Sequence, residues 1–404
     1  MERKGRVLPR IVYALLKIYC FLAAKIKYGF TTDKMPKLKE PYIMLSNHTT
    51  EEDMLFTTLA CRGHMSFVCG EHLLRNPSYG KYLRILLDPI PLPKGGASFS
   101  AMREILRRVS EGDNICMYPE GKRSFHGVTI PSPEALGKLV KKAGCALVTY
   151  RIRGGYFTYP RWARQHLRKG HVEGKVMGVY SSEQLKGMSA KEITDIINRD
   201  TYENAYDVQR EKRWIYKGKD LAYGMDHILF ICPCCKAMDS IKTSGDDFFC
   251  TACGMRGTYN EYGFLEGEDL PFDNVRDWMR FIEPEFDAFA AAHEPGELLF
   301  TEENVRLYQM MEDYRNRDIM ISSLKVYRDR MEIAGKALSG EGEDLSFVFP
   351  FEEINYLSIL FGNILLFTYK GDYYGLTGEA FRAWKCGRLW HLVKGDTDDP
   401  TKEM

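Results

Sequence analysis

The chain has 404 residues, of which 45% are hydrophobic, 13% aromatic and 27% charged, and its formal net charge is +1 at pH 7. This composition is that of a folded protein, and the length is sufficient for two or three domains with separate cores. A net charge so close to zero gives no global reason to expect a nucleic-acid partner.

Residues 1–30 are predicted to form an amphipathic N-terminal helix that associates with a membrane. From Ile11 to Ala24 the sequence is apolar except at Lys17, a stretch shorter than the ~20 residues that a membrane-spanning helix needs. No small-residue cleavage site of a secretory signal follows it. At about 100° per residue the cations gather along one edge, namely Arg6, Arg10 and Lys17, with Lys25 and Lys27 beside it. Such a helix suits a bilayer interface, although a helix docked on the protein's own core would show the same pattern.

An α/β domain, a sheet flanked by helices, is predicted over residues 31–215. Short apolar runs that suit buried strands alternate there with helix-like segments, and functional residues are expected where the strands end. Strands are expected at residues 41–47, 65–70, 114–121 and 145–154, and a helix at 98–113. A further helix is expected over 189–212, because Ser189 and Glu192 form a capping box at its start.

Two short stretches in this region carry chemistry. Residues 46–55, SNHTTEEDML, place His48 five residues before Asp53. Thr50 and Asp53 also satisfy a helix-capping pattern, so the start of a helix would explain this stretch alone. Residues 117–127, MYPEGKRSFHG, place a carboxylate beside two cations at a strand end. Arginine offers a fork that matches phosphate oxygens, although a solvated turn has a similar composition.

Together the two stretches resemble the glycerolipid acyltransferase family, in particular the 1-acyl-sn-glycerol-3-phosphate acyltransferases that form phosphatidic acid. The family's N-H-x4-D motif is matched by Asn47, His48 and Asp53, and its F-P-E-G-T-R-S motif by residues 118–124 with two substitutions. The resemblance covers about residues 10–210.

Two other blocks of the family are matched less closely. Residues 70–96 are similar to the second block, but Lys94 stands where the family usually has arginine. Residues 146–150, ALVTY, are similar to the fourth block without its proline. Because a lysine is a point charge and not a fork, Lys94 weakens the argument that the acceptor must be a phosphate monoester.

The resemblance implies a reaction and a set of site residues. His48 is expected to remove the proton of an acceptor hydroxyl as that oxygen attacks a thioester, while Asp53 fixes the imidazole tautomer. Arg123, with Lys94 and Lys122, is expected to hold a phosphate, and Glu120 to orient the glycerol or support the loop. The predicted substrate-binding residues are Asn47, Lys94, Glu120, Gly121, Lys122 and Arg123.

The implied partners are those of a peripheral enzyme at the cytoplasmic face of a membrane. They are acyl-CoA or acyl carrier protein as donor, a lysophospholipid as acceptor, and membrane lipids. Residues 152–172 are basic and aromatic, with Arg161, Arg164, Arg168 and Lys169 at near-helical spacing, which fits a contact with anionic lipid or the acyl carrier, or a solvated helix face. The alternatives are an acyltransferase for another hydroxylated lipid and a non-catalytic lipid-binding protein on the same fold.

Residues 228–264 are predicted to form a zinc ribbon. Cys232-x2-Cys235 and Cys250-x2-Cys253 have the spacing of two knuckles that hold Zn²⁺ tetrahedrally, and four sulfur ligands would make the ion structural. The extra Cys234 leaves open which of the first three cysteines bind, and a redox-active dithiol is the alternative. The odd total of 11 cysteines favours a reducing compartment.

Residues 297–394 are rich in expected strands and end in an expected helix at 379–393. This order of elements is similar to a pleckstrin-homology (PH) or GRAM-like barrel, which would bind lipid headgroups or pack on the catalytic domain. The acidic tail, residues 395–404, is expected to be disordered.

Overall fold

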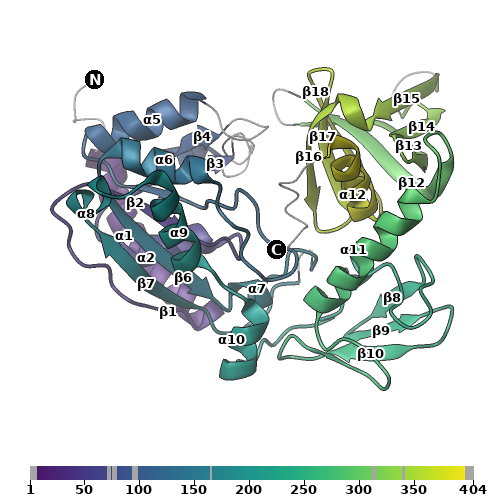
Figure 1. The fold of residues 1–404 in the computed structure, drawn as a ribbon, viewed down its shortest axis with the longest axis horizontal. Coiled ribbons are helices and arrows are strands. Elements are labelled where there is room, and N and C mark those ends of the chain that lie inside the picture. The colour runs from purple at the N-terminus through teal and green to yellow at the C-terminus, as the bar shows by residue number, and fades with distance from the viewer. Residues whose placement is uncertain are drawn as a thin grey trace. The chain divides into compact units, whose positions relative to one another are not determined.

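The protein forms two compact units, each described separately (Figure 1). A computed structural model describes residues 7–70, 74, 80–92, 99–163, 166–311, 315–338 and 342–395. Unit 1 contains the described residues up to 160 together with 168–217, and unit 2 contains 161–167 and those from 218 onward.

Unit 1 is built on a seven-stranded sheet with the strand order β1-β7-β6-β2-β5-β3-β4. Neighbouring strands are parallel except for β6 and β7, which pair antiparallel. The strands are β1 Thr31–Thr32, β2 Tyr42–Ser46, β3 Ser66–Gly70, β4 Ile90–Leu92, β5 Ile115–Met117, β6 Ala146–Arg153 and β7 Glu173–Tyr180. Every residue of the central strand β2 is buried, as expected of a parallel strand covered on both faces.

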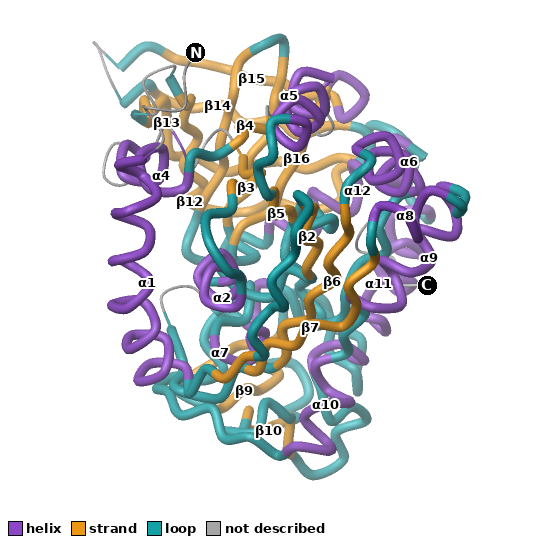
Figure 2. Tube along the Cα trace, turned by 90° about the vertical axis from the view of Figure 1, so that its left-hand side faces the viewer, coloured by secondary structure: helices purple, strands orange, loops and turns teal. Residues whose placement is uncertain are grey.

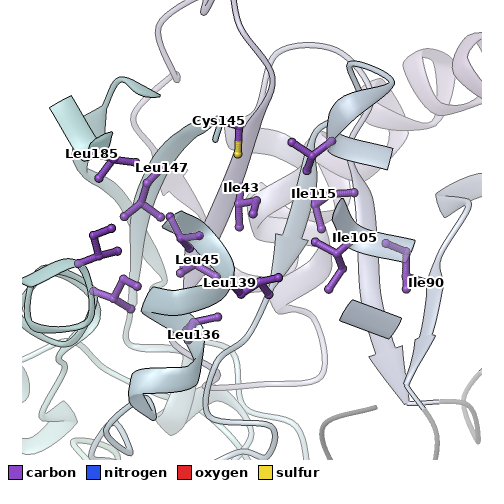
Figure 3. Close-up of a cluster of buried hydrophobic side chains, with 14 of the residues drawn as sticks. Ile43, Leu45, Ile90, Ile105, Ile115, Leu136, Leu139, Cys145, Leu147 and Leu185 are labelled. Carbon is purple, nitrogen blue, oxygen red and sulfur yellow. The ribbon is translucent and has the colours of Figure 1, made fainter. Parts of the chain in front are cut away.

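Helices cover both faces of this sheet, with α1 and α2 on one side and α6, α8 and α9 on the other (Figure 2). The helices of unit 1 are α1 Val7–Tyr28, α2 Asp53–Ala60, α4 Gly80–Leu87, α5 Phe99–Ser110, α6 Glu134–Ala143, α7 Gly155–Thr158, α8 Ser182–Lys186, α9 Ala190–Thr201 and α10 Ala205–Lys212. The main core lies between the sheet and α5, α6, α8 and α9. Figure 3 shows side chains of this core, among them Ile43, Leu45 and Leu147 of the sheet and Leu136 and Leu139 of α6.

Each predicted strand of unit 1 and the predicted helix over 98–113 correspond to an observed element. One predicted helix differs from the structure. The predicted helix over 189–212 is wrong as a single element, because α9 ends at Thr201 and α10 begins at Ala205. Asn204 causes the interruption by accepting a hydrogen bond from the backbone N–H of Tyr206 and so capping a new helix. The capping box of Ser189 and Glu192 is present at the start of α9.

Of the alternatives for residues 152–172, the solvated helix face is not supported by the described residues. Among the described residues of this stretch only α7 is helical, and Pro160 disfavours the helical conformation of the residue before it; Arg164 lies outside the described residues. Arg161 is buried, and its guanidinium donates to the carbonyl oxygen of Ile359 at 2.5 Å within unit 2. Its charge is therefore not displayed on a solvated helix face.

Unit 2 contains two antiparallel sheets. The smaller sheet has the order β11-β10-β9-β8, with the strands β8 Ile241–Ser244, β9 Asp247–Cys250, β10 Arg256–Tyr259 and β11 Leu265–Glu266. It is followed by the helix α11 Val275–Ala291, which we did not predict from the sequence. The larger has the order β15-β14-β13-β12-β18-β17-β16 and forms a half-barrel with a terminal helix. Its elements are β12 Leu298–Met310, β13 Asn316–Tyr327, β14 Arg330–Lys336, β15 Asp344–Pro350, β16 Ile354–Leu360, β17 Ile364–Tyr369, β18 Asp372–Thr377 and α12 Ala383–Lys394. Unit 2 also contains 3₁₀ turns at Met225–His227 and Phe351–Glu353.

Helix α1 is docked on unit 1 along one face and exposes apolar side chains on another. The Lys17 ammonium donates to the carbonyl oxygen of Cys61 at 2.6 Å, and Ala24 and Tyr28 are buried. Lys17 therefore belongs to the docked face and not to a cationic outer edge. Exposed apolar side chains follow the outer face, namely Ile18, Tyr19, Phe21, Leu22 and Ile26. Within the described residues, no helix combines the length and the apolar content needed to cross a bilayer.

Candidate active site

The two sequence motifs meet at the carboxyl ends of adjacent parallel strands. Strand β2 ends at Ser46 and runs into Asn47 and His48, and its neighbour β5 ends two residues before Pro119. Strand β6 lies on the other side of β2. Side chains from the two motifs therefore converge at one edge of the sheet, where open α/β sheets bind their ligands.

His48 and Asp53 form a hydrogen-bonded pair. Nδ1 of His48 lies 2.8 Å from Oδ2 of Asp53, whose side chain is fully buried, while the histidine side chain is 24% exposed. A carboxylate can only accept hydrogen bonds, so it fixes the proton on Nδ1 and leaves Nε2 as a base. The ring of His48 stacks on Tyr118 with centroids 4.7 Å apart, and this contact holds its plane.

The Asp53 carboxylate also organises the loop before α2. Its Oδ2 accepts from the backbone N–H groups of Thr49 at 2.5 Å and Thr50 at 3.1 Å, and its Oδ1 accepts from Oγ1 of Thr49 at 2.9 Å. The capping pattern of Thr50 and Asp53 is thus present in part, and α2 begins only at Asp53 itself. The same aspartate both starts the helix and orients the histidine.

Asn47 joins the end of β2 to the end of β6. Its side-chain amide donates to the carbonyl oxygen of Ile152 at 2.8 Å and accepts from the N–H of Ile152 at 2.7 Å. Asn47 is fully buried. This geometry supports a role in positioning His48 in place of the predicted substrate contact.

Glu120 links the two motifs through the backbone. Its Oε1 accepts from the N–H of His48 at 2.6 Å, and its Oε2 accepts from the N–H of Ile130 at 3.0 Å. Burial raises the pKa of this carboxyl to about 8, while its two backbone hydrogen bonds act in the opposite direction. Of the two roles expected for Glu120, support of the loop is the one that matches these contacts.

The remaining motif residues shape the turn that follows β5. Gly121 has a φ of +66°, a left-handed conformation that favours glycine. Lys122 is partly buried. The Arg123 guanidinium lies 3.2 Å from Oε1 of Glu51 and donates to the carbonyl oxygen of Tyr159 at 3.3 Å. Lys94, the other predicted phosphate contact, lies outside the described residues.

A small pocket lies beside the motifs, and its lining includes a residue that the sequence motifs missed. It has room for about one water molecule, and its lining includes His48, Glu120, Ser124 and Glu203. Glu203 is 4% exposed, and its Oε1 has no hydrogen-bond partner in the described part of the chain. Burial raises the pKa of Glu203 to about 8 although Arg153 opposes this shift. Glu203 follows α9 and belongs to neither motif, so motif matching could not identify it.

The four predicted metal-binding cysteines are clustered in unit 2. Sγ of Cys232 lies 3.7 Å from Sγ of Cys253, and Sγ of Cys235 lies 3.8 Å from Sγ of Cys250. All four sulfurs lie within 4.8 Å of one another. Tetrahedral thiolates at about 2.3 Å from Zn²⁺ are separated by about 3.8 Å, so the cluster fits that ion. Cys234 is exposed and its Sγ lies 3.9 Å from the carbonyl oxygen of Asp269, away from the cluster.

The cysteine cluster is connected to the half-barrel through Asp239, four residues after Cys235. The Asp239 carboxylate accepts from the ammonium of Lys385 at 2.9 Å and lies 3.3 Å from Nε of Arg382, both near the start of α12. Lys385 is fully buried and also pairs with Glu302 of β12 at 2.6 Å. A buried ammonium is costly without its anionic partners, so α12 depends on this loop.

Comparison with known proteins finds a likeness for part of unit 1. Residues 28–153 match the model of the acyltransferase family. The chain is a distant relative of lysophosphatidic acid acyltransferases. A 1-acyl-sn-glycerol-3-phosphate acyltransferase of Streptococcus pneumoniae is 23% identical over 189 residues, which are 45% of this chain and 66% of that relative. The crystal structure of the 1-acyl-sn-glycerophosphate acyltransferase of Thermotoga maritima aligns with a TM-score of 0.42 and 20% identity, over 50% of this chain and 83% of the other.

The buried carboxyls imply that unit 1 becomes less stable as pH rises. The folded-state pKa values of Glu120 and Glu203, both about 8, exceed the ordinary value of 4.5 that unfolding restores. Their contribution to the free energy of unfolding is therefore complete below pH 4.5 and is lost as pH rises toward 8. The slope is at most about 1.4 kcal/mol per pH unit for each group.

Glu203→Gln removes one of these two carboxyl groups, so the pH dependence of its stability can be compared with that of wild type. Urea unfolding at pH ~5 should give nearly equal stabilities, and at pH ~8.5 the variant should be more stable than wild type. Equal stabilities at both values would contradict the burial argument.

The cysteine cluster fits a zinc ion, and an ion bound there would stabilise unit 2. We expect metal analysis of the purified protein to find about one zinc per chain. Cys235→Ser should lose the metal and lower the melting temperature, because Asp239 and hence Lys385 are held by the same loop. Cys234→Ser is the matched control and should keep the metal. Retention of zinc by the Cys235 variant, or its loss from the Cys234 variant, would contradict this assignment.

Proposed function

We propose that the protein moves a fatty acyl chain from acyl-CoA or acyl carrier protein to the free hydroxyl of 1-acyl-sn-glycerol 3-phosphate, forming phosphatidic acid. The observation that carries the proposal is the His48–Asp53 pair, in which a buried carboxylate orients an accessible imidazole. The match of residues 28–153 to the acyltransferase family and the likeness to lysophosphatidic acid acyltransferases support the reaction class.

The proposed reaction is direct transfer without an acyl-enzyme. Nε2 of His48 accepts the proton of the acceptor hydroxyl while its oxygen attacks the thioester carbonyl carbon. The resulting tetrahedral intermediate collapses, the C–S bond breaks, and the thiolate leaves with the proton that His48 returns. Asp53 stabilises the imidazolium that exists between these two steps.

The other motif residues have distinct proposed roles. Arg123 binds the acceptor phosphate, together with Lys122 and Lys94, while Gly121 permits the turn between Glu120 and these cations. Asn47 and Glu120 hold the backbone on either side of the catalytic histidine, through Ile152 and Ile130. A different hydroxylated lipid as acceptor remains the alternative within this reaction class.

The proposed location is the cytoplasmic face of a membrane, with the protein attached peripherally. The exposed side chains of α1 support this proposal, because Ile18, Leu22 and Ile26 lie on one outer face with Lys25 beside them. None of the eleven cysteines, all of which lie in the described residues, forms a disulfide, which suits a reducing compartment. The half-barrel with its terminal helix is proposed to be a PH/GRAM-like domain. The proposed division of the chain is the N-terminal helix 1–30, the acyltransferase domain 31–215, the zinc ribbon 228–264, the PH/GRAM-like domain 297–394 and the tail 395–404.

Loss of the base should abolish transfer without unfolding the domain. With acyl-CoA and 1-acyl-sn-glycerol 3-phosphate, free thiol should be released by wild type, and His48→Ala should lower kcat by about 10²–10⁴-fold. Asp53→Asn should also lower kcat, since an amide can present its N–H to the ring and favour the wrong tautomer. His166→Ala in unit 2 is the control and should be fully active.

The outcomes of this assay separate the alternatives. If wild type releases thiol only with other hydroxylated lipids, the acceptor is wrong and the reaction class stands. Full activity of a folded His48→Ala variant would contradict the assigned base. The absence of release with either donor and every lysolipid would favour a non-catalytic lipid-binding protein.

Membrane attachment should depend on the outer face of α1. Replacing Ile18, Leu22 and Ile26 together with serine should lower co-sedimentation with anionic liposomes by about tenfold or more, because three exposed apolar side chains would no longer enter the interface. Ile321→Ser removes an exposed apolar side chain from β13 and should leave binding unchanged. Undiminished binding of the triple variant would contradict the proposal.

A further inference from the structure

Arg123, the proposed contact for the acceptor phosphate, already has a carboxylate partner. Nη2 of Arg123 lies 3.2 Å from Oε1 of Glu51. The arginine is held from a second direction by Tyr159, whose carbonyl oxygen accepts from Nη1 at 3.3 Å and whose ring centroid lies 5.5 Å from the guanidinium carbon. The side chain of Arg123 is only 10% exposed. The guanidinium is therefore fixed in place by a residue other than Glu51.

Glu51 differs from Arg123 in its freedom to move. Its side chain is 58% exposed, so its carboxylate can turn into solvent without a large desolvation cost. The two acids that follow it are held elsewhere. Glu52 accepts from the hydroxyls of Tyr28 and Thr50, and Asp53 is buried against His48. Of the three consecutive carboxylates, Glu51 is the one that pairs with Arg123.

We propose that Glu51 is a specificity-determining residue whose carboxylate competes with the acceptor's phosphate for Arg123. The inference rests on the proposed function, because it takes Arg123 as the phosphate contact. A phosphate monoester carries about −1.5 to −2 charges near pH 7, and it can pair with the guanidinium only after Glu51 has turned away. An acceptor without a phosphate does not require this exchange. Glu51 therefore lowers the preference of the site for phosphorylated acceptors over uncharged ones.

Glu51→Gln is the decisive variant because it preserves the shape of the side chain and removes its charge. We expect kcat/KM for 1-acyl-sn-glycerol 3-phosphate to rise about fivefold, through a lower KM, in line with the modest strength of a partly exposed ion pair. Activity with 1-monoacylglycerol should not rise, so the ratio of the two activities should change. Glu52→Gln removes a neighbouring charge that does not pair with Arg123, and it should leave that ratio as in wild type.

A binding measurement makes the test independent of activity. Isothermal titration with sn-glycerol 3-phosphate should show about fivefold tighter binding to Glu51→Gln than to wild type. In an Arg123→Gln background the same substitution should give no gain, because the shared partner is absent. Unchanged or weaker binding by Glu51→Gln, or a gain that persists without Arg123, would overturn the inference.

The inference and the proposed function fail in distinguishable ways. If wild type does not acylate 1-acyl-sn-glycerol 3-phosphate while Glu51→Gln still binds glycerol phosphate more tightly, the proposed acceptor is wrong and the competition for Arg123 stands. If wild type is an active lysophosphatidic acid acyltransferase and Glu51→Gln matches it in both KM and binding, only the role of Glu51 is wrong.

Discussion

The buried carboxylate of Asp53 is the constraint on which the candidate site depends. A buried carboxylate is tolerated only when its oxygens are satisfied, and those of Asp53 accept from the backbone of Thr49 and Thr50, the hydroxyl of Thr49 and the ring of His48. These four bonds force residues 48–53 to wrap around one point. Asp53 is also the first residue of α2, so its negative charge lies at the positive end of the helix dipole. The tautomer of His48 is thus a consequence of how the loop folds.

The rest of the site continues the hydrogen bonding of the sheet beyond the ends of its strands. The amide of Asn47 pairs with both backbone groups of Ile152, as a further residue of β2 would with its neighbour β6. Glu120 then joins the N–H of His48 to that of Ile130, which connects the loop after β2 with the segment after β5. The loop that carries His48 is therefore fixed on both sides to the sheet of unit 1 and the segments that follow its strands. Pre-organisation of this kind keeps a reacting group within a fraction of an ångström of its working position.

The sequence was sufficient for the pattern of strands, the proximity of His48 and Asp53 and the cluster of four cysteines, because each depends on spacing along the chain. It was insufficient wherever the direction of a side chain decides the role. Glu51, Glu52 and Asp53 are consecutive carboxylates with similar chemistry. In the structure they nevertheless have different partners, Arg123, Tyr28 and His48 respectively. The break between α9 and α10 and the placement of Cys234 away from the other cysteines have the same origin. Glu203 reaches the pocket from outside any motif, so only the fold reveals it.

Each of the three acidic residues 51–53 has a partner among the described residues. Asp53 is paired with His48, Glu51 with Arg123, and Glu52 with Tyr28 and, at 4.0 Å, with Lys27 of α1. Among the described residues, an anionic acceptor that binds Arg123 would therefore have to replace Glu51 as its partner. Such an exchange yields modest affinity, because the gain from the new ion pair is offset by the loss of the old one. Modest affinity would be adequate for the proposed enzyme, which would take its acceptor from a bilayer, where attachment to the surface raises the local concentration of lipid. Lys27 and Tyr28 belong to α1, whose outer face is apolar. The proposed membrane contact and the residues that pair with Glu52 therefore lie on the same helix.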